Sequence, residues 1–89
     1  MDLVWDPEKD EWLKSQRFIS FGEITAKIQA GEYLDIIDNP SRPDQHYFIL
    51  TLRDYTWVVP FLFDELDRIV LKTAFPSRKF HRKYGGEKQ

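Results

Sequence analysis

The stretch FPSRKFHRKYGG, residues 75–86, is the most basic part of the sequence and carries side chains that suit phosphodiester chemistry. Cleavage of RNA needs a base for the 2′-hydroxyl, stabilisation of the charge on the phosphorane, and an acid for the leaving oxygen. Arg and Lys stabilise such charge, and His, Lys or Tyr can transfer the protons. The candidate catalytic residues are therefore Arg78, Lys79, His81 and Tyr84.

Further cations are of the type that holds the phosphates of an RNA chain. The candidate RNA-binding residues are Arg53, Lys72, Arg82 and Lys83. Aromatic rings beside them suit stacking on unpaired bases. The same composition is also typical of a plain helix end, where cations face solvent or complement the helix dipole. The residues alone leave both interpretations open.

The net charge of −2 hides an uneven distribution along the chain. Residues 1–67 contain 14 acidic and 6 basic side chains, whereas residues 68–89 contain 1 acidic and 7 basic ones. Such segregation is compatible with an electropositive face for an anionic partner, with the acidic remainder facing elsewhere, and equally with a role in solubility alone.

Several classes of site find no support in the sequence. It has no cysteine for disulfides or thiolate ligands, and its two histidines are too few for an ordinary zinc site. Neither a glycine-rich nucleotide loop nor a Gly-x-Ser-x-Gly motif is present. We therefore expect an activity that uses no cofactor and no metal ion.

The sequence also lacks the signals of membrane or secreted proteins. No apolar run approaches the roughly 18 residues that span a bilayer, and the first residues do not form a signal sequence. A soluble cytoplasmic protein without membrane contacts is expected.

Two short helices are predicted back to back near the N-terminus. The first lies in DPEKDEWLKSQRF, with Asp6 as N-cap and Pro7 at the first helical position. The second begins after Ser20, whose spacing to Glu23 matches a capping box, and Gly31 ends it.

Most of the remaining sequence predicts β-strands. The predicted strands are 3–5 at an edge, then 33–37, 46–53, 56–63 and 68–75. Short turns make the last three antiparallel neighbours. Pro60 indicates an edge position or a bulge. In the last strand, strict alternation would place Arg68 and Lys72 on one face and Ile69, Leu71, Thr73 and Phe75 on the other.

The predicted fold class is α+β, with two N-terminal helices packed on one face of a curved antiparallel sheet. SRKFHRKY, residues 77–84, adds one more helical turn before Gly85 and Gly86 end it. We expect a single domain over residues 1–84 and a flexible tail over 85–89.

The order of these signals resembles the BrnT family, the ribonuclease toxins of bacterial type II toxin–antitoxin modules. LVWDPEK and ISFGEI correspond to the family's Trp-Asp, a Lys four residues after the Trp, and an Ile/Val-Ser-Phe helix start. Ser77-Arg78-Lys79 corresponds to the family's Ala-Arg-Lys. The pattern departs from the family at three places. Arg17 and Phe18 stand where members commonly have His-Gly, and His46 or Tyr47 stands where an Arg usually opens the second strand. The last strand is longer than in the family, with Pro76 interposed before Ser77-Arg78-Lys79.

The resemblance implies a RelE-like microbial RNase fold and an endoribonuclease that cleaves mRNA, either free or on the ribosome. It also implies a cognate antitoxin that binds the toxin, and contact with DNA only through that antitoxin. Two alternatives stay open. One is a non-catalytic interaction module whose basic end binds an acidic protein or RNA. The other is a toxin of the same superfamily that acts on gyrase.

Overall fold

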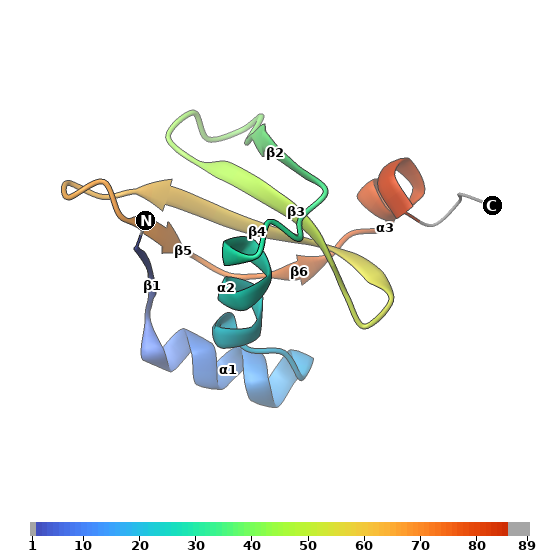
Figure 1. Cartoon of the computed structure of the whole chain (residues 1–89), viewed down its shortest axis with the longest axis horizontal. Coiled ribbons are helices and arrows are strands. Elements are labelled where there is room, and N and C mark those ends of the chain that lie inside the picture. The colour runs from blue at the N-terminus through green and yellow to red at the C-terminus, as the bar shows by residue number, and fades with distance from the viewer. Residues whose placement is uncertain (1, 86–89) are drawn as a thin grey trace.

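The computed structural model describes residues 2–85. Its elements are β1 (Leu3–Trp5), α1 (Pro7–Arg17), α2 (Phe21–Gln29), β2 (Asp35–Asp38), β3 (His46–Leu52), β4 (Tyr55–Phe63), β5 (Ile69–Leu71), β6 (Phe75–Pro76), α3 (Arg78–Phe80) and the π-helical turn η1 (His81–Gly85). The fold is α+β, as predicted, with α1 and α2 on one side of a six-stranded sheet (Figure 1). Gly85, expected in the tail, is the last residue of η1, and the rest of that tail, 86–89, lies outside the described residues.

The sheet follows the order β1-β5-β4-β3-β2, and β6 pairs with β4 beyond the end of β5. All pairs are antiparallel except β1 with β5, which run parallel with Leu3 opposite Ile69. The edge position predicted for residues 3–5 is confirmed. Its partner was not predicted, because nothing in three residues indicates which distant strand they join.

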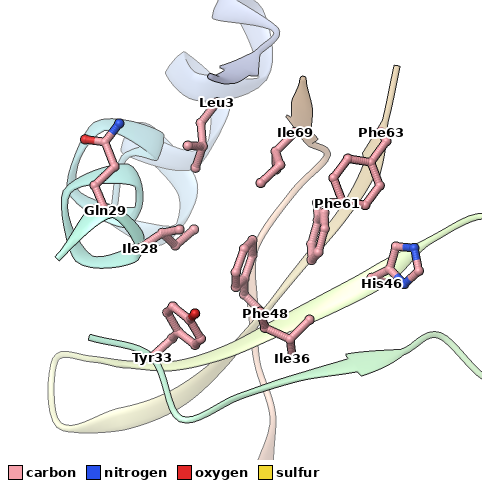
Figure 2. A pocket seen from close by; sticks show the side chains of 10 residues that line it. All are labelled: Leu3, Ile28, Gln29, Tyr33, Ile36, His46, Phe48, Phe61, Phe63 and Ile69. Atoms are coloured by element: carbon pink, nitrogen blue, oxygen red, sulfur yellow. The ribbon is translucent and has the colours of Figure 1, made fainter. Parts of the chain in front are cut away.

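The two faces of the sheet bury different sets of side chains. The face under the helices holds the main core, to which β3 and β4 contribute Phe48, Leu50, Leu52, Trp57, Val59 and Phe61. Leu13 of α1 and Phe21 and Ile24 of α2 cover it and are fully buried. Beyond the last turn of α2, part of this face remains uncovered and forms a hollow (Figure 2). The opposite face buries Ile49 and Val58.

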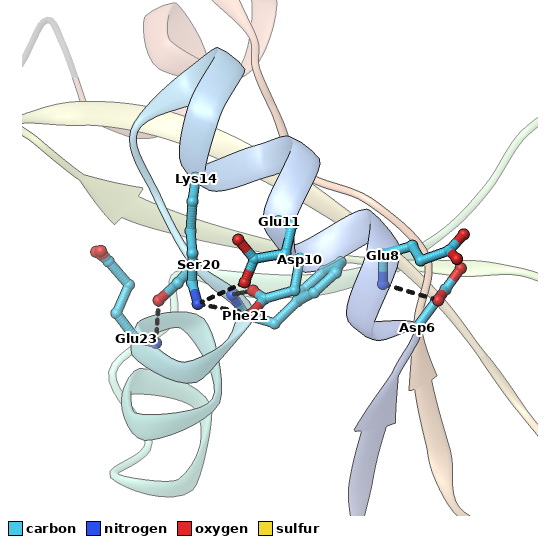
Figure 3. Close-up of polar contacts among 8 residues, drawn as sticks. All are labelled: Asp6, Glu8, Asp10, Glu11, Lys14, Ser20, Phe21 and Glu23. Carbon is cyan, nitrogen blue, oxygen red and sulfur yellow. Dashed lines mark hydrogen bonds and ion pairs between the residues drawn. The ribbon is translucent and has the colours of Figure 1, made fainter.

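The junction between α1 and α2 is held by side chains that cap both helices (Figure 3). Asp6 Oδ1 accepts from Glu8 N, and Ser20 Oγ accepts from Glu23 N, so both predicted N-caps are confirmed. Asp10 of α1 reaches across the junction, where its Oδ1 accepts from Phe21 N at 2.8 Å. The two helices are therefore joined by a hydrogen bond as well as by packing.

The ends of both helices use the left-handed backbone region. Gly31, at φ 75°, ends α2, and its N–H and that of the next residue bond back to Ile28 and Lys27 carbonyls. Phe18, at φ 60°, ends α1 and is 75% exposed. That conformation favours glycine, which is the residue of the BrnT pattern at this position. The chain leaves α2 through the Gly31 turn, so β2 begins at Asp35 rather than at Tyr33 as predicted.

The predicted strand 68–75 is wrong in its second half, where it divides into β5 and β6. Lys72 N donates to Pro60 O, but proline has no N–H to return the bond. The register then shifts: Phe61 pairs with Leu71, whereas Val58 pairs with Phe75, so the second strand holds one extra residue. The bulge breaks the expected alternation and sends Phe75 to the face opposite the helices. Pro60 thus marks a bulge within the sheet, not an edge.

Candidate functional site

The helical stretch 78–85, made of α3 and η1, packs on the sheet face opposite α1 and α2, and we call it the basic segment. Ser77 caps it, with its Oγ accepting from Phe80 N and its carbonyl accepting from His81 N. Figure 1 shows α3 at the end of the molecule away from β1 and β5.

The basic segment has an inner and an outer side. Its half-buried side chains are Phe80, His81 and Tyr84. Its exposed ones are Arg78, Lys79, Arg82 and Lys83. None of these four cations forms an ion pair with another residue of the described range 2–85. The predicted residues are therefore brought together, and their charges are available to an anion.

His81 is fixed in orientation by two contacts on β4. Its Nδ1 lies 3.1 Å from Thr56 Oγ1, and its ring stacks on Tyr55 with ring centres 4.0 Å apart. Thr56 is the one polar residue that is fully buried among those described. Because Nδ1 is engaged, proton transfer by His81 would use Nε2.

Tyr84 is tied to β2. Its hydroxyl donates to Asp35 Oδ2 at 2.6 Å. This hydrogen bond raises the pKa of the Tyr84 hydroxyl and lowers the pKa of the Asp35 carboxyl, with the Ile36 backbone N–H adding to the second effect. A phenol held in its neutral form by a carboxylate is suited to positioning the segment and poorly suited to taking up a proton.

Aromatic side chains support the segment from the sheet. The Tyr47 ring lies edge-to-face with both Phe75 and Phe80, at 6.5 and 6.4 Å between centres. Phe80 in turn lies 6.1 Å from the ring of Tyr84. Tyr47 is one of the two residues, with His46, that stand where an Arg is expected from the BrnT pattern, and its contacts to the segment are aromatic.

The two candidates on the sheet behave differently. Arg53 forms a two-point ion pair with Glu23, at 2.8 and 2.9 Å, and donates to the carbonyl of Phe18. Glu23 thereby raises the pKa of Arg53, and the cation serves to fix the β3–β4 turn against α2. Lys72 is exposed within the bulge beside Pro60 and has no ion-pair partner among residues 2–85.

Three residues of the site were not predicted as site residues: Asp35, Thr56 and Tyr47, of which Tyr47 was noted only as a departure from the BrnT pattern. A signal for two of them existed. Asp35 interrupts the apolar run YLDII, and Thr56 begins the otherwise apolar run TWVVPFLF. A polar residue inside an apolar strand needs a partner when it is buried. Tyr47 gave no such signal, because an aromatic residue in a strand is ordinary.

The arrangement offers charge stabilisation by several cations and one oriented imidazole. Over residues 2–85, no group of three or more His, Cys, Asp or Glu is placed to hold a metal ion. The helices of the described chain are all too short or too polar to cross a membrane.

Comparison with known proteins gives one informative likeness. No protein-family model matches the sequence, and no curated protein matches it significantly. Among solved structures, the chain is similar to the Brucella abortus ribonuclease toxin BrnT, with a TM-score of 0.63 and 15% identity. The match covers 86% of this chain and 96% of the toxin. At this identity the likeness establishes a BrnT-like fold.

Proposed function

We propose that the chain is the toxin of a type II toxin–antitoxin system, an endoribonuclease that cleaves mRNA without a metal ion and arrests growth. The observation that carries the proposal is the basic segment, where four exposed cations and an oriented histidine lie on one helical stretch. The BrnT-like fold supports it, because the similar structure is that of a ribonuclease toxin. At the coarser level, both features favour a toxin ribonuclease.

In this proposal each residue of the basic segment has a role. Arg78 stabilises the charge of the phosphorane, with Lys79 assisting. His81 transfers a proton through Nε2, since Thr56 holds its other nitrogen. Tyr84 positions the segment through Asp35. Arg82 and Lys83 hold flanking phosphates, with Lys72 as a further contact from the sheet. Arg53 adds little, because Glu23 neutralises it.

The proposal includes two partners. One is an RNA substrate, free or on the ribosome. The other is a cognate antitoxin protein, which would bind this chain and contact DNA in its place. Co-expression of a small protein encoded beside the chain's own gene should then restore growth.

The first test is cleavage of a labelled single-stranded RNA by purified protein in EDTA. We expect cleavage by the parent protein and a loss of about 100-fold or more in the Arg78→Ala variant, as when one transition-state donor is removed. Arg42→Ala is the matched control, because Arg42 is an exposed cation in the loop between β2 and β3. Equal cleavage by the Arg78 variant, with both variants folded, would remove Arg78 from the mechanism.

The second candidate function is a binding module without catalysis. RNA cleavage needs both a base and an acid, but the Tyr84–Asp35 hydrogen bond takes Tyr84 out of proton transfer. His81 is then the one oriented proton-transfer group among the predicted residues, which favours binding without catalysis. The same experiment separates the two functions. A shift of intact RNA on a gel, lost with added salt, would favour the module.

A further inference from the structure

An apolar groove lies on the helix-covered face of the sheet, between the last turn of α2 and the β4–β5 turn (Figure 2). Its volume is about 500 Å³. Phe48 and Phe61 form its floor, stacked with ring centres 4.4 Å apart. Its sides are formed by Leu3, Ile28, Gln29, Tyr33, Ile36, His46, Phe63 and Ile69. The groove thus exposes the same apolar face that α1 and α2 cover elsewhere.

Large apolar side chains beside the groove are exposed. Ile36 and Phe63, which line the groove, are 45% and 49% exposed, and Leu34, two residues before Ile36, is 45% exposed. Leu66 lies in the β4–β5 turn and is 71% exposed. Exposed apolar side chains that line a groove favour an interaction site, because their contact with water costs free energy.

Acidic residues predominate among the charged residues that neighbour the groove lining in the sequence, and Lys27, which precedes Ile28, lines a separate hollow with Glu23 and Arg53. Exposed acidic residues precede its lining residues or lie in the β4–β5 turn: Asp2, Glu32, Glu65 and Asp67. The side chain of Asp38 is 92% exposed, and its Oδ1 lies 3.1 Å from Nδ1 of the groove residue His46. The adjoining cation, Arg68, is already paired with Asp64 at 2.8 Å. An occupant with basic flanks would therefore be complementary to the rim.

These features exclude some occupants and favour one. Acidic rims repel RNA phosphates and anionic lipid headgroups. The polar side chains of the lining are Gln29, Tyr33 and His46, and the ring of His46 is already engaged by Asp38. We infer that the groove binds an amphipathic helix of a partner protein, apolar on the face that enters it and basic along its flanks.

A helix fits the place as well as the chemistry. The layer of helices over this face ends at Gln29, and the groove begins there. A helix lying in the groove would continue that layer across the remaining strands. The inference is independent of the proposed nuclease activity, because the groove lies on the opposite face of the sheet from the basic segment and its test uses no RNA.

The test uses two synthetic 18-residue peptides that form the same leucine-faced amphipathic helix, one with lysine flanks and one with glutamate flanks. Binding to the full chain is measured by fluorescence anisotropy and located by amide chemical-shift changes. We expect the lysine peptide to bind at least about tenfold more tightly than its twin, with shifts centred on Leu3, Ile36 and Phe63.

Two variants of equal charge change decide the site. Phe63→Glu should weaken binding of the lysine peptide about tenfold or more. If the contact were purely electrostatic, the added negative charge would instead tighten binding. Phe18→Glu, an equally exposed aromatic position outside the groove, should leave binding unchanged. Equal affinity for both peptides, or no effect of Phe63→Glu, would overturn the inference. So would a dimer of the chain alone that Phe63→Glu dissociates, since a second copy would then fill the groove.

Discussion

At the scale of single residues, the contact between Tyr84 and Asp35 joins segments that are far apart in the sequence. It is a short hydrogen bond to an ionised carboxylate, which is a strong type. It ties the basic segment to an edge strand of the sheet. The charge state of two side chains therefore bears on how firmly the basic segment is held.

This contact predicts a pH-dependent stability. Folding lowers the pKa of Asp35, so the ionised carboxylate stabilises the fold at pH values above its ordinary pKa of 3.8. That contribution is lost as the pH falls through the folded-state pKa. Folding raises the pKa of Tyr84, so the neutral hydroxyl stabilises the fold at pH values below its ordinary pKa of 10.0. That contribution is lost as the pH rises through the folded-state pKa. Tyr84→Phe should therefore lower the urea midpoint at neutral pH.

The difference between parent and Tyr84→Phe should narrow below pH 3.8 and above pH 10.0. Tyr33→Phe is the control, since the Tyr33 hydroxyl forms no hydrogen bond to another described residue. A constant difference across the pH range would mean that Tyr84 acts through packing and not through the Asp35 carboxylate.

The candidate residues of the basic segment could be named from the sequence, but the side chains that hold them in place could not. A run of Arg, Lys, His and Tyr is compatible with chemistry on anions, and equally with a solvated helix end. The partners Thr56 and Asp35 lie 25 and 49 residues away in the sequence. Sequence spacing carries information over a few residues of one helix or strand, and none about which faces meet after folding.

At the scale of elements, Asp10 carries much of the α1–α2 junction. It accepts from Phe21 N and pairs with Lys14 at 3.2 Å. Asp10→Ala should lower the free energy of unfolding by about 1–2 kcal/mol, because an N–H in the first turn of α2 loses its acceptor. Glu11→Ala is the control, since Glu11 is exposed and contacts only Lys14 among its charged neighbours. That change should cost less than about 0.5 kcal/mol.

Urea denaturation of both variants measures the difference. Equal effects of Asp10→Ala and Glu11→Ala would show that the hydrogen bond between the two helices contributes little, and that packing of Leu13 and Phe21 alone holds the junction.

The elements show where local rules suffice. Asp6, Ser20 and Gly31 act over two to five residues, and each begins or ends its helix as predicted. The capping box at Ser20 is completed only on one side, because Glu23 turns to Arg53 of the β3–β4 turn. Pro60 was expected to mark an edge or a bulge. The sequence did not show that the extra residue would lie on the neighbouring strand, after Leu71.

At the scale of the whole molecule, the separation of charge predicts how RNA binding responds to salt. The logarithm of the association constant should fall with the logarithm of the salt concentration, by about 0.7 for each phosphate held on a single strand. If all four exposed cations of the basic segment hold phosphates, the slope should be about −3.

Replacing Lys79 and Lys83 together by Ala should reduce the magnitude of that slope by about 1.4. Fluorescence anisotropy with a short labelled RNA, repeated over a range of KCl concentrations, gives the slope directly. Arg42→Ala should leave it unchanged. A slope that is the same in the double variant would place the RNA on another surface.

The overall architecture was predictable because alternating patterns and turn residues agree along most of the chain. The BrnT-like fold was anticipated from short motifs such as LVWDPEK and ISFGEI, and the structural likeness bears it out at the level of fold. The apolar groove was not anticipated. Its lining residues come from seven segments, each of which resembles ordinary core when considered alone.

The parallel pairing of β1 with β5 has a consequence for synthesis of the chain. β1 leaves the ribosome long before β5 does, and it has no strand to join until residues 69–71 follow. Closing so long a loop is slow, and an unpaired edge is exposed meanwhile. The basic segment comes later still, and its supports on β2, β3 and β4 are in place before it arrives. A nascent chain therefore stays without a packed basic segment until residue 85 has left the ribosome.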